Sequence, residues 1–112
     1  MEMCRGTSLS AIIDPAAIPE LPGLDDYITQ GCVPGGTQRN FDALEHDLPT
    51  LTRRELAVLC DPQTSGGLLI AVSPSAVKDV QQRLTEQELP LTVVGSFIPN
   101  ENGESAIQLQ TG

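Results

Sequence analysis

The sequence predicts an α+β fold, a mixed β-sheet with helices packed against it. Three observations carry this prediction. Residues 8–13 alternate polar and apolar side chains, as a strand with one buried face does. Residues 68–72 form a short continuous apolar run, typical of a strand covered on both faces. Residues 77–84 carry apolar side chains at helical spacing and lie between this run and another apolar stretch at 91–98.

The first part of the chain is expected to hold one strand and one short helix. Residues 1–6 are interpreted as the end of a helix closed by Gly6, and the lack of a cap before them indicates a folding unit that begins upstream. The strand at 8–13 is followed by a segment with three prolines, which forces an extended crossing. Residues 23–30 can form a short helix with two aspartates in its first turn.

The second part is expected to contain a βαβ unit. Thr52 and Glu55 have the spacing of a capping box, so a helix starts there, and Pro62 ends it. A strand is predicted at 67–72, followed by a helix that begins at Ser73-Pro74, runs to about residue 88 and ends before Pro90. A second strand is predicted at 91–98, which completes the βαβ unit. After a turn at Asn102-Gly103, a hairpin strand is predicted at 105–110.

Composition bounds the function. The 112 residues are expected to make one domain, or part of one. They are 39% hydrophobic, with no apolar run near the roughly 20 residues of a membrane span. The net charge of −9 opposes binding to nucleic acid and to anionic membranes. The start has no signal-peptide apolar core, which predicts a cytoplasmic protein.

The cysteines and the single histidine do not form a recognisable site. Cys4, Cys32 and Cys60 are far apart with no CxxC pair, so neither zinc nor a disulfide framework is supported, and three small buried thiols are expected. His46 lies in a polar run without a partner histidine, and we interpret it as a solvated loop residue.

Residues 31–40, GCVPGGTQRN, are predicted to be a tight loop. Three glycines and a proline within six residues preset the backbone path. Arg39, one of only six basic residues, lies beside this turn. Two interpretations stay open: backbone N–H groups and a guanidinium that bind an anion, or a structural turn next to a surface arginine.

Residues 60–67, CDPQTSGG, form the second notable loop. Gly66 and Gly67 allow positive φ or close approach of another group, and the loop offers two hydroxyls and a carboxylate. A phosphate-binding P-loop runs strand, loop, helix and ends in lysine and serine or threonine. Here the predicted order is helix, loop, strand, and no lysine follows the glycines, so this is not a Walker loop.

Together these loops carry a resemblance. PGGTQRN at 34–40 and LCDPQTSGGLLIAV at 59–72, separated by a helix, resemble the C-terminal domain of selenophosphate synthetases (selenide, water dikinases). EMC-x-G at 2–6, AAIPELPGLDDYI at 16–28 and LTVVGSFIP at 91–99 occur in that family's order, so the resemblance covers nearly the whole chain. It implies a domain of the aminoimidazole ribonucleotide synthetase-like superfamily that lacks its first strand.

The resemblance implies a parent enzyme that uses ATP, Mg²⁺, selenide and water to make selenophosphate, AMP and phosphate, as a cytoplasmic homodimer. Its N-terminal domain carries the reactive Cys or selenocysteine and most metal-binding acids, and 1–112 would be the truncated C-terminal domain alone. Phosphoryl transfer depends on positioned metal ions and cations, so this chain by itself is expected to be inactive, without a cofactor.

The resemblance also places the two loops at the cleft between the domains. The candidate cleft-lining or anion-binding residues are Gly35, Gly36, Thr37, Arg39, Asn40, Asp61, Thr64, Ser65, Gly66 and Gly67. No catalytic residue or metal ligand is assigned. A purely structural role for both loops stays open, as do a non-catalytic assembly or regulatory module and the same domain from a sister ATP-dependent synthetase or kinase.

Overall fold

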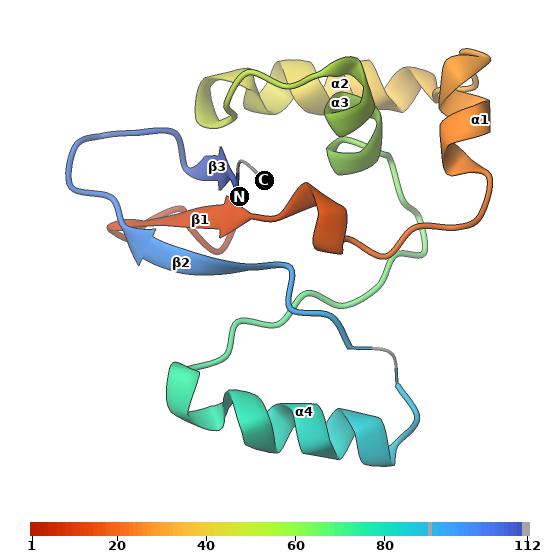
Figure 1. Cartoon of the computed structure of the whole chain (residues 1–112). Helices are drawn as coiled ribbons and strands as arrows, with labels where there is room; N and C mark the ends of the chain where they lie inside the picture. The colour runs from red at the N-terminus through yellow and green to blue at the C-terminus, as the bar shows by residue number, and fades with distance from the viewer. Residues whose placement is uncertain (90, 111–112) are drawn as a thin grey trace. The chain divides into compact units, whose positions relative to one another are not determined.

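The computed structural model describes residues 1–89 and 91–110 (Figure 1). It confirms the α+β class, with a three-stranded mixed sheet in the order β2-β1-β3. The strands are β1 (Leu9–Ile13), β2 (Gly95–Pro99) and β3 (Ile107–Leu109). The chain divides into two compact units, one of Met1–Pro62 with the residues from Val94 onward and one of Gln63–Val93.

The sheet belongs to the first unit and is organised around β1. β2 is antiparallel to β1, with Ala11 opposite Phe97. β3 is parallel to β1, with Ala11 opposite Ile107. Ser10, in the central strand, is fully buried, and its hydroxyl donates to the carbonyl of Ser105 at 3.0 Å. This buried polar group therefore has a hydrogen-bond partner.

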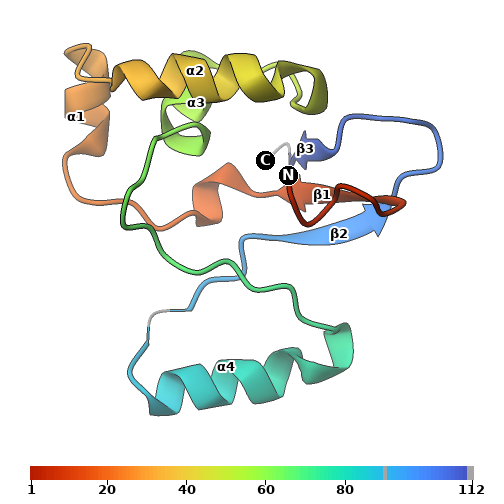
Figure 2. The ribbon, with the colours of Figure 1, turned by 180° about the vertical axis from the view of Figure 1, so that it is seen from behind.

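Three α-helices complete the first unit and lie on the same side of its sheet in both views (Figures 1 and 2). They are α1 (Leu24–Thr29), α2 (Gly35–Leu44) and α3 (Arg53–Leu59), with 3₁₀ turns at Pro15–Ala17 and Glu45–Asp47. The predicted capping box at the start of α3 is confirmed: the Thr52 side chain accepts from the Glu55 N–H, and the Glu55 carboxylate accepts from the Thr52 N–H at 2.7 Å.

Arg54, in α3, forms ion pairs with α1 and with the proline-containing segment that precedes it. Arg54 Nε lies 2.6 Å from Asp25 Oδ1, at the first turn of α1, and its Nη2 lies 2.7 Å from Glu20 Oε2. The hydrogen bonds that the guanidinium donates to these two carboxylates raise its pKa. The two ion pairs therefore tie the segment before α1 and α1 itself to α3.

The core of the first unit is small and made of short side chains. Its buried residues, apolar and polar, are Cys4, Ser10, Ala11, Ile28, Thr37, Ala57 and Cys60. Cys4 and Cys60 are buried as predicted, whereas Cys32 is exposed, so the expectation of three buried thiols is wrong for that residue. Burial raises the pKa of the Cys60 thiol, because desolvation disfavours the thiolate.

The second unit contains a 3₁₀ turn at Pro74–Ala76 and helix α4 (Val77–Glu86). The predicted helix is confirmed, although it ends two residues earlier than expected, with Gln87 as its C-cap, and Ser73 makes no side-chain capping bond. Pro90, the predicted stop, lies outside the described residues. Lys78 on this helix is exposed.

Several strand predictions are wrong. Residues 67–72 form no strand, and 91–94 lie outside β2, so the predicted βαβ unit is not formed among the described residues. An apolar run indicates that its side chains favour burial, but it does not show whether the segment pairs as a strand, because pairing depends on segments that are distant in sequence. The expected hairpin of 91–98 with 105–110 is also wrong, because β2 and β3 both pair with β1 and lie on opposite sides of it.

The amino terminus also differs from its prediction. Residues 1–6 form hydrogen-bonded turns, in which the Cys4 and Arg5 N–H groups donate to the Met1 carbonyl, and no α-helix. Gly6 has the positive φ of +73° that its predicted role as a terminator requires. The turns lead directly into β1.

Candidate functional site

The first candidate loop is in fact the start of a helix. Residues 35–44 form α2, with Pro34 as its N-cap, so the prediction of a loop over 31–40 is wrong beyond residue 34. Proline and glycine are typical of turns, but a proline just before a helix removes only a donor that would have no intrahelical partner. Gly35, Gly36 and Thr37 therefore occupy the first turn of a ten-residue helix.

Two contacts hold this turn against the segment that follows α3. A Cβ placed on Gly36 would lie 2.9 Å from Pro62 Cγ and 3.0 Å from its Cβ, so only glycine fits there without a shift. One turn further along, Asn40 Nδ2 donates to the Cys60 carbonyl at 2.9 Å. The beginning of α2 and residues 60–62, two segments that the sequence singled out, thus lie against each other within the first unit.

The polar groups of the α2 start differ in their surroundings. Thr37 is only 1% exposed, and its hydroxyl oxygen has no hydrogen-bond partner among the described residues. Arg39 is exposed, and its Nη2 lies 3.7 Å from the Cβ position of Gly36, so the guanidinium folds back along the first turn. A helix start carries partial positive charge, and an arginine beside it adds to the attraction for an anion.

The remaining candidate residues divide between the two units. Asp61 is half-buried and belongs to the first unit, whereas Thr64, Ser65, Gly66 and Gly67 are exposed and belong to the second. Neither Gly66 nor Gly67 has a positive φ, so the prediction that these glycines are needed for a left-handed backbone conformation is wrong. Gly66 does have a close neighbour: a Cβ there would lie 2.9 Å from Gln63 Oε1.

No metal-binding group emerges from the described part of the chain, where no three His, Cys, Asp or Glu side chains converge. His46 is exposed, as predicted, with its Nε2 3.7 Å from Glu45 Oε1. Sequence reasoning missed two partners, Pro62 beside Gly36 and the Cys60 carbonyl beside Asn40, because no spacing rule links positions that meet only through packing.

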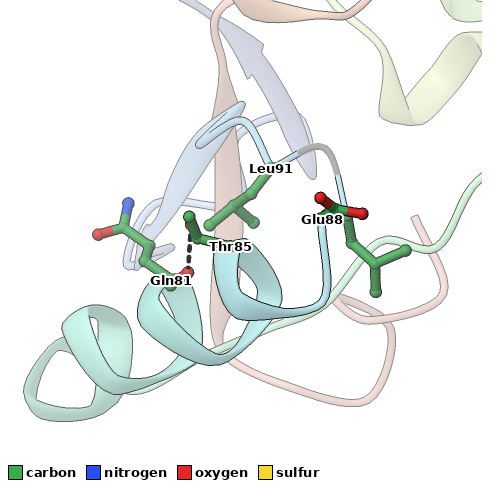
Figure 3. A pocket seen from close by; sticks show the side chains of 5 residues that line it. Gln81, Thr85, Glu88 and Leu91 are labelled. Atoms are coloured by element: carbon green, nitrogen blue, oxygen red, sulfur yellow. Dashed lines mark hydrogen bonds between the residues drawn. The ribbon is translucent and has the colours of Figure 1, made fainter.

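Two surface hollows lie away from the candidate residues. One, of about 560 Å³, is at the end of α4 and is lined by Gln81, Thr85, Glu88, Leu89 and Leu91 (Figure 3). Its Thr85 hydroxyl already donates a hydrogen bond to the Gln81 carbonyl at 2.8 Å, so this donor is not available to a ligand. The other, of about 500 Å³, lies beside the end of α2 and includes Phe41, His46 and Leu51. Neither hollow includes a candidate residue.

Comparison with known proteins finds relatives that match nearly the whole chain. The chain is 43% identical over 109 residues to selenide, water dikinases of Escherichia coli strain K12, Escherichia coli O157:H7 and Shigella flexneri. The chain is homologous to the C-terminal part of selenide, water dikinases. The match covers 97% of this chain and 31% of each relative, so the chain spans about a third of the length of the curated relatives it matches. No protein-family model matches it.

The comparison agrees with the resemblance drawn from the two motifs and does not favour the alternatives of an assembly module or a sister synthetase. In the portion of the chain that the structure covers, no helix has both the length and the apolar character needed to cross a membrane.

Proposed function

We propose that the chain is the C-terminal domain of a selenide, water dikinase, an enzyme that converts ATP, selenide and water into selenophosphate, AMP and phosphate. The observation that carries this is identity of 43% across 97% of the chain to enzymes of that name. ATP and Mg²⁺ belong to the whole enzyme, which we infer to be a cytoplasmic homodimer. The domain's role is to close one side of the active-site cleft.

A domain exchange tests this function. The C-terminal part of the Escherichia coli relative is replaced by residues 1–112, and selenide-dependent formation of AMP from ATP is measured. We expect a rate within about tenfold of the parent, that is, within roughly 1.4 kcal/mol of transition-state stabilisation. The Escherichia coli enzyme without its C-terminal part, as the control, should be inactive. A soluble chimera that binds ATP but forms no AMP would overturn the proposal.

We also propose that residues 1–112 alone do not turn over. Their charge is −9 with a single lysine, whereas phosphoryl transfer needs cations and metal ions placed around the phosphates. The isolated chain with ATP, Mg²⁺ and selenide is expected to form no AMP above background. Turnover by the isolated chain would show that it holds a complete catalytic set.

Within the domain, we assign anion contact to the start of α2. The supporting observations are the ten-residue helix, the Arg39 guanidinium folded along its first turn, and the buried Thr37 hydroxyl. Gly35 and Gly36 leave the backbone N–H groups unobstructed by side chains of their own, while Asn40 braces the helix. Asp61, which also belongs to the first unit, is assigned to the same surface as the α2 start. Residues 64–67, in the second unit, are proposed separately as cleft-lining residues of the whole enzyme.

Charge removal separates this role from a structural one. In the chimera, Arg39→Gln should lower kcat/KM for ATP by about 10- to 100-fold, the value of a charge-assisted hydrogen bond. The matched control is Arg83→Gln, which removes an arginine from α4 and should leave kcat/KM unchanged. Thr64→Ala with Gly67→Ala should also lower activity. Unchanged kinetics in Arg39→Gln would leave the α2 start with a structural role only.

A further inference from the structure

The loop that joins β2 to β3 contains the dipeptide Asn102-Gly103, which belongs to the first unit but not to the candidate site (Figure 1). The side-chain amide carbon of an asparagine is electrophilic, and attack on it by the next backbone nitrogen closes a five-membered ring. Glycine at the next position has no Cβ to hinder this approach and leaves the backbone free to rotate. The sequence alone therefore makes Asn102 the asparagine most open to attack by its own main chain.

The local structure leaves both reacting groups of this dipeptide accessible. Asn102 and Gly103 are exposed, and nothing lies within 4 Å of a Cβ placed on Gly103. Within the described ranges, neither the Asn102 side-chain amide nor the Gly103 N–H takes part in a hydrogen bond. No interaction in that part of the chain has to break before the nitrogen can approach the amide carbon.

The other two asparagines of the chain are held by hydrogen bonds. Asn40 lies in α2, is half-buried and donates to the Cys60 carbonyl at 2.9 Å. Asn100 is half-buried, and its Nδ2 donates to the Glu104 carbonyl at 2.9 Å while its Oδ1 accepts from the Glu104 N–H at 3.0 Å. These bonds oppose rotation of the two amides, and each asparagine precedes a residue that carries a Cβ.

We propose that Asn102 is a site of spontaneous deamidation that produces isoaspartate in the folded chain. The Gly103 nitrogen loses its proton to solvent and bonds to Cγ of Asn102, and the bond from Cγ to Nδ2 breaks as ammonia leaves with a proton. Water then opens the cyclic imide. Attack of water on the main-chain carbonyl carbon of Asn102 gives isoaspartate, and attack on Cγ gives aspartate.

The two ends of the loop confine the change. The Asn100 N–H donates to the Ser8 carbonyl at 2.9 Å, and the Ala11 N–H donates to the Ala106 carbonyl at 2.8 Å. Isoaspartate inserts a methylene into the main chain between these anchors and adds a negative charge to a loop that already has two glutamates. We expect the bonds between Asn100 and Glu104 to be lost while β2 and β3 stay paired with β1, because loop tips accommodate insertions.

Peptide mapping by mass spectrometry tests this proposal on the 112-residue chain, kept in mildly alkaline buffer with and without urea. Isoaspartate is scored by the labelled methyl group that a protein isoaspartate methyltransferase adds. In the folded chain, Asn102 should react at least about tenfold faster than Asn40 or Asn100, and within about tenfold of its own rate in urea. Asn102→Ser should abolish methyl transfer, and Gly103→Ala should slow it at least about tenfold.

The control is Gly6→Ala, because Gly6 has φ +73° against +67° for Gly103 and equally open surroundings but follows no asparagine. It should leave the rate at Asn102 unchanged. Equal rates at Asn100 and Asn102 overturn the proposal, and so does a folded rate at Asn102 more than about tenfold below the rate in urea, which would show that the loop protects it. Methyl transfer that persists in Asn102→Ser contradicts the site, and faster amide exchange of β1 after conversion contradicts the confinement to the loop.

Discussion

Gly35 and Gly36 are neighbours in the first turn of α2 but have different surroundings. Nothing lies within 4 Å of a Cβ placed on Gly35, whereas a Cβ on Gly36 would meet the Pro62 ring. The sequence placed both in a predicted tight loop. It could not distinguish them, because the contact that makes one of them necessary comes from a residue 26 positions away (62 − 36).

The pair yields a matched prediction. Gly36→Ala should destabilise the chain by about 1–2 kcal/mol, because overpacking against Pro62 outweighs the gain in helix propensity. Gly35→Ala should stabilise it by about 0.5–1 kcal/mol, because it restricts the unfolded chain and meets no obstacle. Urea unfolding followed by circular dichroism measures both. Equal effects from the two substitutions would contradict the assigned Gly36–Pro62 packing.

At the level of single elements, local signals were the most reliable guide. The capping box at Thr52 and Glu55, the strand near residues 9–13 and the helix after Pro74 are all specified by residues close in sequence. The run at 68–72 and the PGGT start of α2 were interpreted wrongly. In each case the pattern was real, but its outcome depended on partners or neighbours that no local rule supplies.

The capping box makes the stability of α3 depend on pH. Hydrogen bonds from Thr52 lower the pKa of Glu55 below its usual 4.5. A lowered folded-state pKa gives stability that is present above the unfolded pKa and is lost as pH falls through the folded pKa. The wild type should therefore exceed Glu55→Gln in unfolding midpoint at pH 7, and the difference should shrink below about pH 4.5. A difference that is constant from pH 7 to pH 3 would contradict this assignment.

Helix α4 ends in a conformation that its sequence does not favour. Glu88 has φ +55°, and the bonds from Glu88 N–H to the Thr85 carbonyl and from Leu89 N–H to the Leu84 carbonyl form a Schellman motif. Glycine is the usual residue at this position because it carries no Cβ. Local reasoning placed the helix end near residue 88 but could not foresee a left-handed glutamate.

Glu88→Gly should therefore stabilise α4 by about 1 kcal/mol, the cost of a left-handed conformation for a residue with a Cβ. The control is Gln87→Gly: the neighbouring C-cap has φ −93°, and substitution there should destabilise the helix by about 0.5–1 kcal/mol. Amide exchange of the α4 residues provides the measurement. Slower exchange in Gln87→Gly than in Glu88→Gly would rule out the Schellman assignment.

At the scale of the whole molecule, burial is concentrated in one of the two units. Every residue of the buried core lies in the first unit, and α4 contains no buried residue. Hydrogen-bonded amides exchange slowly only where opening them is costly, and that cost follows the apolar contacts that opening breaks. The two units are thus expected to open with different free energies.

Native-state amide exchange should resolve this difference. The amides of β1 should show the largest opening free energies, close to that of global unfolding, while those of α4 should exchange at least about tenfold faster, equivalent to 1.4 kcal/mol or more. Arg54→Met, which removes the ion pairs to Glu20 and Asp25, should lower the protection of α1 and α3 and leave α4 unchanged. If β1 and α4 share one opening free energy in the wild type and both fall in Arg54→Met, the two units unfold as a single cooperative body and stability is not divided between them.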